Sequence, residues 1–182
     1  MIITISGTAG SGKSTVAKAV AKEFGLKHYS AGDFMRELAV KRNISLMEIG
    51  RLAEKDVSID REIDECTKKL AKEDNFVIDS RLAFHFIPKA IRIFLKVAPG
   101  IAAKRIWRDI KAKKRAVEQF SSEKEVLSGI LKRQDSEVKR YRKYYRLDYL
   151  DEKSYDFVLD TSKLNVQESI EEVLKFIREK II

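Results

Sequence analysis

Residues 7–14 constrain the fold of this chain more than any other segment. They read GTAGSGKS and match the phosphate-binding pattern GxxxxGK[ST]. The apolar, β-branched run 1–6 precedes them, and a helical pattern of apolar residues follows as far as Phe24. This motif occurs in proteins as a glycine-rich loop between a strand and a helix. The sequence therefore predicts a P-loop at the carboxyl end of a buried strand.

A loop of this type binds the phosphates of a nucleoside triphosphate. Its backbone N–H groups point at phosphate oxygens, and the helix N-terminus adds positive potential. Lys13 bridges the outer phosphates, which makes it a catalytic candidate, and the Ser14 hydroxyl is a candidate ligand of Mg²⁺. The expected ATP-binding residues of the loop are Gly7, Thr8, Ala9, Gly10, Ser11, Gly12, Lys13, Ser14 and Thr15.

Further short apolar runs predict four more buried strands, at 27–29, 76–78, 91–97 and 155–159. Helical periodicity occupies the stretches between and after them, at 33–41, 45–55, 60–72, 99–113, 122–145 and 165–180. Strands that alternate with helices indicate an α/β fold. We expect a three-layer sandwich of the P-loop NTP hydrolase type, with a five-stranded parallel sheet.

The 182 residues are expected to form one domain, since no Pro-rich or Gly/Ser-rich linker divides them. The expected core comprises 1–32, 73–104 and 147–182. Two helical excursions interrupt the alternation of strands and helices, at 33–72 and 105–146. Excursions at the carboxyl ends of parallel strands lie where open α/β sheets bind their ligands.

Two arginines follow predicted strands beside the P-loop. The segment 30–36 reads SAGDFMR, which places Gly32 at a tight turn and Arg36 one turn into a helix. Arg81 follows the strand at 76–78 almost directly. Because a planar guanidinium group binds phosphate oxygens in pairs, these arginines favour an acceptor that already carries a phosphate.

Asp79 ends the strand at 76–78, where P-loop enzymes commonly hold a carboxylate near the metal ion. We expect it to bind Mg²⁺ through water. The alternative is a general base that deprotonates a small alcohol, with Asp33 as the second candidate for that role. A phosphate acceptor needs no base, because it is already an anionic nucleophile.

The formal net charge of +9 resides in one stretch of the chain. Residues 104–146 hold 15 Lys or Arg and 6 Asp or Glu, and the remainder is balanced. Within this stretch Arg133, Glu137 and Arg140 recur at helical spacing and share one face. Both arginines are catalytic candidates that converge on the transferring phosphoryl group, with Glu137 orienting them.

An RNA-binding surface is a less favoured explanation of the same charge. Residues 139–146 interleave basic and aromatic side chains, as some RNA-binding surfaces do. However, Tyr141, Tyr144 and Tyr145 fall on one helical face, which is typical of packing. We expect no nucleic-acid partner.

The single cysteine, Cys66, cannot form an internal disulfide. The sequence also shows no secretory leader, and its apolar runs are too short to span a bilayer. We therefore expect a cytoplasmic protein without a membrane partner.

Seven segments together resemble the nucleoside monophosphate kinases, and most closely the short archaeal-type cytidylate kinases. They occur in the order found in that family and cover nearly the whole chain. The segments are GTAGSGKST at 7–15, YSAGDFMR at 29–36, IDREID at 59–64, IDSRLA at 78–83, RIWRD at 105–109, RQDSEVKRYRKYYRLD at 133–148 and YDFVLDTS at 155–162.

The resemblance implies transfer of the γ-phosphoryl group of ATP to CMP or dCMP with Mg²⁺, and we expect the protein to be a monomer. The resemblance also implies an acceptor-binding region at 33–72, a lid at about 107–126, and an adenine site near Arg105. Arg133 and Arg140 would serve transfer, and the acceptor would contact Ser30, Gly32, Arg36, Asp60 and Arg81. Residues 65–67, ECT, depart from the basic, Gln-containing stretch expected in the family, so AMP or UMP remains an alternative acceptor.

Overall fold

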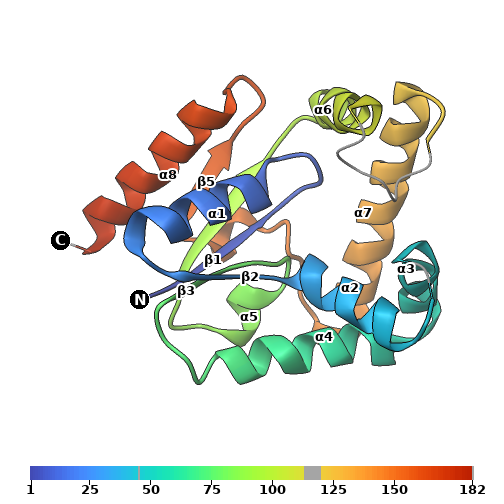
Figure 1. Cartoon of the computed structure of the whole chain (residues 1–182), viewed down its shortest axis with the longest axis horizontal. Coiled ribbons are helices and arrows are strands. Elements are labelled where there is room, and N and C mark those ends of the chain that lie inside the picture. Colours follow the sequence, from blue (N-terminus) through green and yellow to red (C-terminus); the bar gives the residue numbers. More distant parts are fainter. Residues whose placement is uncertain (45, 113–119, 182) are drawn as a thin grey trace.

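The computed structural model describes residues 1–44, 46–112 and 120–181. Its five strands form one parallel sheet in the order β2-β3-β1-β4-β5 (Figure 1), which confirms the predicted fold class. The strands are β1 (Ile2–Gly7), β2 (Lys27–Ser30), β3 (Phe76–Asp79), β4 (Ile91–Lys96) and β5 (Phe157–Asp160). Every residue of β1 is buried, as expected for the central strand of a parallel sheet.

Helices α1 (Lys13–Phe24) and α8 (Val166–Ile181) cover one face of the sheet. Their apolar faces pack on Ile3, Ile5, Ile93 and Leu95 in the largest cluster of buried residues. The short helix α5 (Ala83–Phe86) and the last turn of α4 (Val57–Leu70) cover the opposite face around Phe76 and Ile78. The protein is therefore the three-layer sandwich that the sequence predicts.

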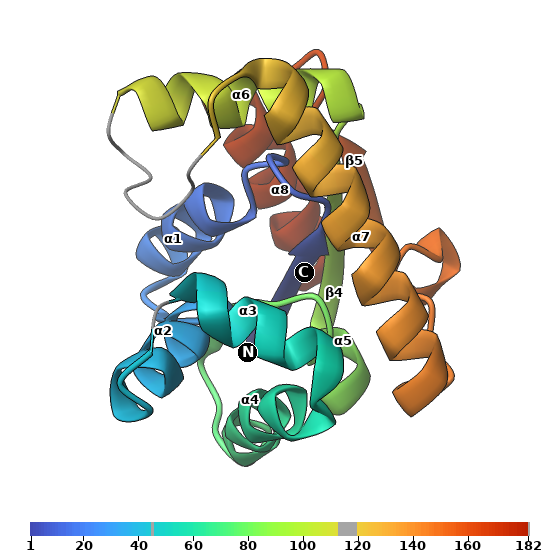
Figure 2. The ribbon, with the colours of Figure 1, turned by 90° about the vertical axis from the view of Figure 1, so that its right-hand side faces the viewer.

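Two helical insertions extend beyond the sandwich at the carboxyl ends of the strands. The first lies between β2 and β3 and comprises α2 (Ala31–Lys41), α3 (Leu46–Lys55) and α4 (Val57–Leu70), which share a small core of their own. The second lies between β4 and β5 and comprises α6 (Pro99–Lys111) and α7 (Glu123–Tyr145). In Figure 2 these insertions frame the end of β1 and the start of α1.

Some predicted boundaries differ from those observed. β5 begins at Phe157 rather than at residue 155, because Tyr155 closes the 3₁₀ helix η1 (Glu152–Ser154) through a backbone hydrogen bond to Glu152. Helices α5 and η1 are too short to produce a recognisable periodicity. Residues 113–119 of the expected lid at 107–126 lie outside the described residues, as does residue 45. Across the described ranges, no helix is long and apolar enough to cross a membrane.

Candidate functional site

The P-loop joins β1 to α1, and two of its glycines adopt left-handed conformations. Gly10 has φ 73° and Gly12 has φ 91°. A Cβ atom on Gly7 would lie 2.0 Å from the carbonyl oxygen of Leu95, and one on Gly10 would lie 2.9 Å from the Ala102 backbone. Glycine is therefore required at Gly7 and Gly10 because β4 and α6 press directly on the loop.

Lys13 is the first residue of α1, and its Nζ donates a hydrogen bond to the Thr8 carbonyl oxygen at 3.0 Å. Burial lowers the pKa of Lys13 to about 7, and the Arg81 guanidinium adds to this effect. The carboxylates of Asp79 and Glu137 oppose the shift. A phosphate group beside Lys13 would raise that pKa, since an adjacent anion favours the ammonium form.

Ser14 and Asp79, the two residues expected to bind the metal ion, meet next to the loop. The Ser14 hydroxyl donates to one carboxylate oxygen of Asp79, and His28 Nε2 lies 3.1 Å from the other. Ser30 stands beside Asp79 on the neighbouring strand. Burial acts to raise the pKa of Asp79, but the hydrogen bonds from His28, Ser14 and Ser30 outweigh it and hold that pKa below its ordinary value.

This donor set fits Mg²⁺, which prefers hydroxyl, carboxylate and water oxygens. Among the described residues, no cluster of three or more His, Cys, Asp or Glu side chains could hold a metal ion. Mg²⁺ usually binds through one or two protein oxygens together with substrate phosphates and water. Ser14 and Asp79 are therefore sufficient protein partners for it.

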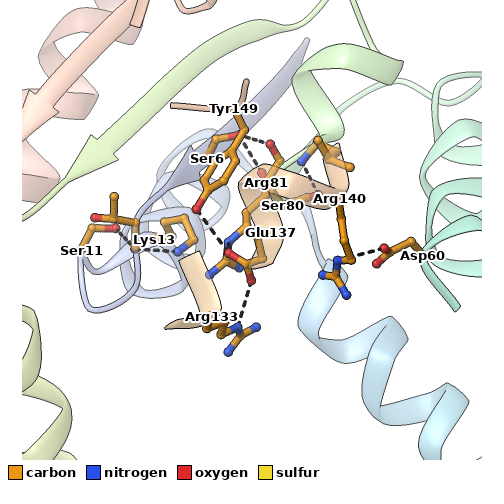
Figure 3. A network of polar contacts seen from close by, with 12 residues as sticks. Ser6, Ser11, Lys13, Asp60, Ser80, Arg81, Arg133, Glu137, Arg140 and Tyr149 are labelled. Atoms are coloured by element: carbon orange, nitrogen blue, oxygen red, sulfur yellow. Dashed lines mark hydrogen bonds and ion pairs between the residues drawn. The ribbon is translucent and has the colours of Figure 1, made fainter. Parts of the chain in front are cut away.

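Glu137 of α7 lies at the centre of a cluster of cations (Figure 3). One of its carboxylate oxygens lies 2.9 Å from Arg133 Nε, and the other lies 2.6 Å from Arg81 Nε. The Tyr149 hydroxyl donates to the second oxygen at 3.2 Å. Burial acts to raise the pKa of Glu137, but Arg81, Arg133 and Lys13 outweigh it and keep the carboxylate ionised.

Arg140 projects from the same face of α7 but approaches a different partner. Its Nε lies 3.5 Å from a carboxylate oxygen of Asp60 on α4, and both side chains are nearly buried. Within the described residues neither of these two atoms has a hydrogen-bond partner. Helical spacing predicts that Glu137 orients both arginines, but only Arg133 pairs with Glu137, while Arg140 pairs with Asp60 (Figure 3).

Arg36 and Gly32 lie in the first two turns of α2, so the tight turn predicted at Gly32 is wrong: the helix begins at Ala31, directly after β2. Arg36 donates to Asp33, and the Arg36 side chain remains half exposed. A Cβ atom on Gly32 would lie 3.8 Å from Arg36 Nη1 and 3.4 Å from the Ser30 hydroxyl. Ser30, Gly32 and Arg36 therefore form one local group at the carboxyl end of β2.

Arg105 of α6 connects the P-loop to the loop after β5. Its guanidinium donates to the carbonyl oxygens of Gly10, Thr161 and Leu164, at 3.4, 2.6 and 3.0 Å. It also donates to the Thr161 hydroxyl at 3.1 Å. The arginine expected near adenine thus lies against one side of the P-loop.

Sequence reasoning did not identify three contacts of this site. It gave no role to His28, which contacts Asp79, or to Tyr149, which contacts Glu137. It also missed the hydrogen bond from Tyr145 to Asp64 of α4. His28 and Ser30 are two residues apart in β2 and therefore share one face of the sheet, a spacing that could have indicated the contact with Asp79. Tyr149 gave no such signal, because it follows α7 in a segment without periodicity.

Comparison with known proteins identifies the family. Residues 2–163 match the family model described as the Cytidylate kinase-like family. The chain belongs to the cytidylate kinase-like family. It is 36% identical over 178 residues to the cytidylate kinase of Methanothrix thermoacetophila, covering 98% of each chain. It is 42% identical over 165 residues to that of Methanocella arvoryzae, covering 90% of this chain and 89% of the relative.

Solved structures share the fold at low sequence identity. An uncharacterized protein from Eubacterium ventriosum aligns with a TM-score of 0.72 at 23% identity, covering 98% of each chain. The shikimate kinase of Bacteroides thetaiotaomicron aligns with a TM-score of 0.63 at 14% identity, also covering 98% of each. At such identities the likeness extends to the P-loop kinase fold alone.

Proposed function

We propose that the protein transfers the γ-phosphoryl group of ATP to the phosphate of CMP, and also of dCMP. One observation carries this proposal: Lys13 of the P-loop, Arg81 of the neighbouring strand end and Arg133 of α7 surround a single buried carboxylate, Glu137. Cations on three separate elements suit a donor phosphate and an acceptor phosphate brought together. The membership of the family and the cytidylate kinases similar to this chain support the same activity.

On the donor side, the P-loop backbone and Lys13 hold the triphosphate, with Arg105 at the adenine end. Ser14 and Asp79, which share a hydrogen bond beside the loop, would hold Mg²⁺, Ser14 directly and Asp79 through water. Mg²⁺ would neutralise charge on the transferring group and orient it. The remaining catalytic contribution is the placement of the cations, because the transition state of phosphoryl transfer spreads charge over its equatorial oxygens.

On the acceptor side, Arg36 and Arg81 hold the phosphate, and Ser30 and Gly32 lie beside it where β2 passes directly into α2. In this proposal Asp60 and Arg140, which form an ion pair at 3.5 Å, contact the base. This assigns Arg140 to base recognition instead of the transfer role that its position beside Arg133 on α7 predicts. Cytosine presents an amino donor next to ring acceptors, which complements a carboxylate beside a guanidinium. In this proposal residues 33–72 bind the acceptor, and residues 105–146 carry the lid and its flanking helices.

A kinase for a small alcohol would need Asp33 or Asp79 as a free base. Asp33 accepts from Arg36, and Asp79 accepts from Ser14. Since hydrogen bonds hold the pKa of Asp79 below its ordinary value, that carboxylate is a weak proton acceptor. These contacts favour a phosphate acceptor over an alcohol.

The basic helix α7 offers a poor surface for stacking RNA bases. Tyr141 is buried, Lys139 pairs with Asp135, and Arg142 pairs with Asp148. Sequence-tolerant RNA binding needs exposed aromatic rings between free cations. We therefore expect no nucleic-acid partner.

A coupled assay of ADP release tests the proposal with CMP, dCMP, UMP and AMP as acceptors. We expect CMP and dCMP to give the highest kcat/KM. ADP release that none of the four accelerates, or acceleration by a hydroxylated acceptor without phosphate, would overturn the proposal. A parallel measurement in which Asp33→Asn leaves CMP turnover intact would separate a phosphate acceptor from an alcohol that needs Asp33 as its base.

A further inference from the structure

Glu137 has two arginine partners that differ sharply in their exposure. The Arg81 side chain is 17% exposed, the Arg133 side chain 55%, and the Glu137 side chain only 5%. An ion pair with an exposed member contributes little, because water and salt screen it. A buried pair is costly to break, because each partner left behind is an unpaired charge. Glu137 thus shares a buried ion pair with Arg81, whose Nε forms no hydrogen bond within the described residues, and an exposed, hydrogen-bonded pair with Arg133. Burial makes the first pair the harder one to separate.

The buried pair rests on the aromatic core behind it. Tyr149 donates to the Glu137 oxygen that Arg81 approaches, and its ring lies 6.0 Å from the Arg81 guanidinium. The Tyr149 carbonyl in turn accepts from the buried Tyr155 hydroxyl at 2.7 Å. The ring of Tyr141, one turn after Glu137, packs edge-on against Tyr149. These contacts therefore keep the Glu137 carboxylate in place when Arg133 moves.

The exposed pair faces the P-loop. Arg133 contacts Glu137 from one turn earlier on α7. Lys13 is close enough for the Glu137 carboxylate to act to raise the pKa of Lys13. Phosphates bound by the P-loop would attract the Arg133 guanidinium more strongly than a carboxylate that Arg81 has already neutralised. Arg133 would then exchange partners while Arg81 stays in place.

We propose that Glu137 is a positioning residue that fixes Arg81 and holds Arg133 within reach of the transferring phosphoryl group until phosphate releases it. This inference rests on the proposed function, because it gives the two arginines roles in phosphoryl transfer. It concerns placement alone, since Glu137 does not itself contact the reacting atoms.

The principal test is Glu137→Gln in the full chain, measured alone and combined with Arg133→Ala. We expect Glu137→Gln to lower kcat for CMP by about 10²-fold, the effect of a misplaced catalytic group, with little change in KM. If Glu137 acts through Arg133, its effect on kcat shrinks several-fold when Arg133 is already Ala. Equal effects in the two backgrounds would overturn the proposal.

A binding measurement distinguishes positioning from a merely structural role. Calorimetric titration with ATP alone involves no transfer and reports how strongly the site attracts phosphate. Loss of one negative charge should tighten ATP binding by about fivefold in Glu137→Gln, and not in the variant that also carries Arg133→Ala. Weaker ATP binding in step with a lower melting temperature would show a structural role and overturn the proposal.

Two further variants guard against misfolding and unspecific effects. Glu137→Asp keeps the charge but shortens the side chain, so it should fold, hold Arg81 and still lower kcat. Full kcat in Glu137→Asp would contradict the proposal. Asp135→Asn is the matched control, because Asp135 forms an exposed pair with Lys139 on the same helix. It should leave kcat and ATP affinity unchanged.

The two proposals fail in different ways. If the wild-type protein accelerates ADP release with none of the four acceptors, the proposed function fails. The ATP titrations of Glu137→Gln in the two backgrounds remain interpretable, because they require no acceptor. Unchanged ATP affinity in both backgrounds would then count against the role of Glu137 alone.

Discussion

The Tyr145 hydroxyl donates a hydrogen bond to the Asp64 carboxylate and so joins the last turn of α7 to the middle of α4. Asp64 is buried, and burial raises its pKa to about 6 although the Tyr145 hydrogen bond opposes the shift. The ordinary value of 3.8 applies to the unfolded chain. Between these values the folded protein binds the additional proton, so the Asp64 contribution to stability falls as pH rises from about 4 to about 6.

Asp64→Asn should therefore stabilise the protein relative to wild type by an amount that grows across this interval. We expect a difference in unfolding free energy of about 1 kcal/mol above pH 6, and less near pH 4. Denaturant unfolding at several pH values measures it. Tyr145→Phe removes a hydrogen bond that favours the carboxylate, so the midpoint of the pH dependence should move upward. A difference independent of pH would mean that the pKa of Asp64 is the same in the folded and the unfolded chain.

Asp60→Asn should change which base the acceptor site prefers. The variant replaces an acceptor of hydrogen bonds with a group that also donates, which suits the carbonyl at position 4 of uracil better than the amino group of cytosine. We expect the ratio of kcat/KM for CMP to that for UMP to fall by about 10-fold or more. An unchanged ratio would place the base elsewhere. The KM for ATP serves as the control and should remain constant.

Ser14→Ala should raise the Mg²⁺ concentration that gives half-maximal rate, by about 10-fold. The hydroxyl is a direct oxygen ligand in our proposal, and it also orients Asp79. Activity titrated with Mg²⁺ at saturating ATP and CMP provides the measurement. Ser14→Thr retains the hydroxyl and should behave like wild type. An identical Mg²⁺ requirement in Ser14→Ala would remove Ser14 from the metal site.

Gly129→Ala should destabilise the protein, although alanine is the better helix former. A Cβ atom at this position in α7 would lie 2.7 Å from the Phe120 ring, which packs in the core between α6 and α7. Displacing that ring should cost about 1–3 kcal/mol, more than the gain in helix propensity. Gly50→Ala in α3 is the matched control, because a Cβ there would meet no atom within 4 Å. It should stabilise by about 0.5–1 kcal/mol.

Arg146→Gly should stabilise the protein by about 0.5–1 kcal/mol. Arg146 ends α7 in the left-handed conformation with φ 54°, where a side chain is strained and glycine is not. Thermal unfolding measures the change. Arg146→Ala keeps the strained Cβ and removes the charge, so it should not stabilise. Equal stabilisation by alanine would attribute the effect to charge rather than to backbone conformation.

The sheet and the P-loop could be predicted because they leave local signals. Short β-branched runs such as 76–78 and 91–97 alternate with helical periodicity, and the spacing from Gly7 to Ser14 is that of a known phosphate-binding loop. The two metal candidates could be brought together for the same reason. Asp79 ends the strand next to β1, and carboxyl ends of parallel strands share one edge of the sheet.

Helical spacing predicted a shared face for Arg133 and Arg140 with Glu137 as the partner of both, which is correct for Arg133 and wrong for Arg140. The two side chains do project from one face of α7, yet Arg133 pairs with Glu137 and Arg140 approaches Asp60. Asp60 belongs to another insertion, and its position relative to α7 depends on how the two insertions pack. A periodic pattern contains no information about that packing.

The contact between His28 and Asp79 depends on the order of the strands, which the sequence does not encode locally. The two residues meet because β2 lies next to β3 in parallel register, with Ser30 beside Asp79. If β2 and β3 were not neighbours in the sheet, His28 and Asp79 would lie on strands that do not touch. Tyr149 reaches Glu137 from an irregular segment, where side-chain direction follows no period.

The sheet order also has a consequence for the synthesis of the protein. β1 is fully buried and pairs on one side with β3 and on the other with β4. Neither partner exists until the ribosome has produced residues 76–79 and 91–96. The apolar strand β1 therefore has no partner strand until about half of the chain has been synthesised. We expect the nascent chain to need shelter from aggregation during that interval, and to gain nucleotide-binding ability only once β4 has emerged.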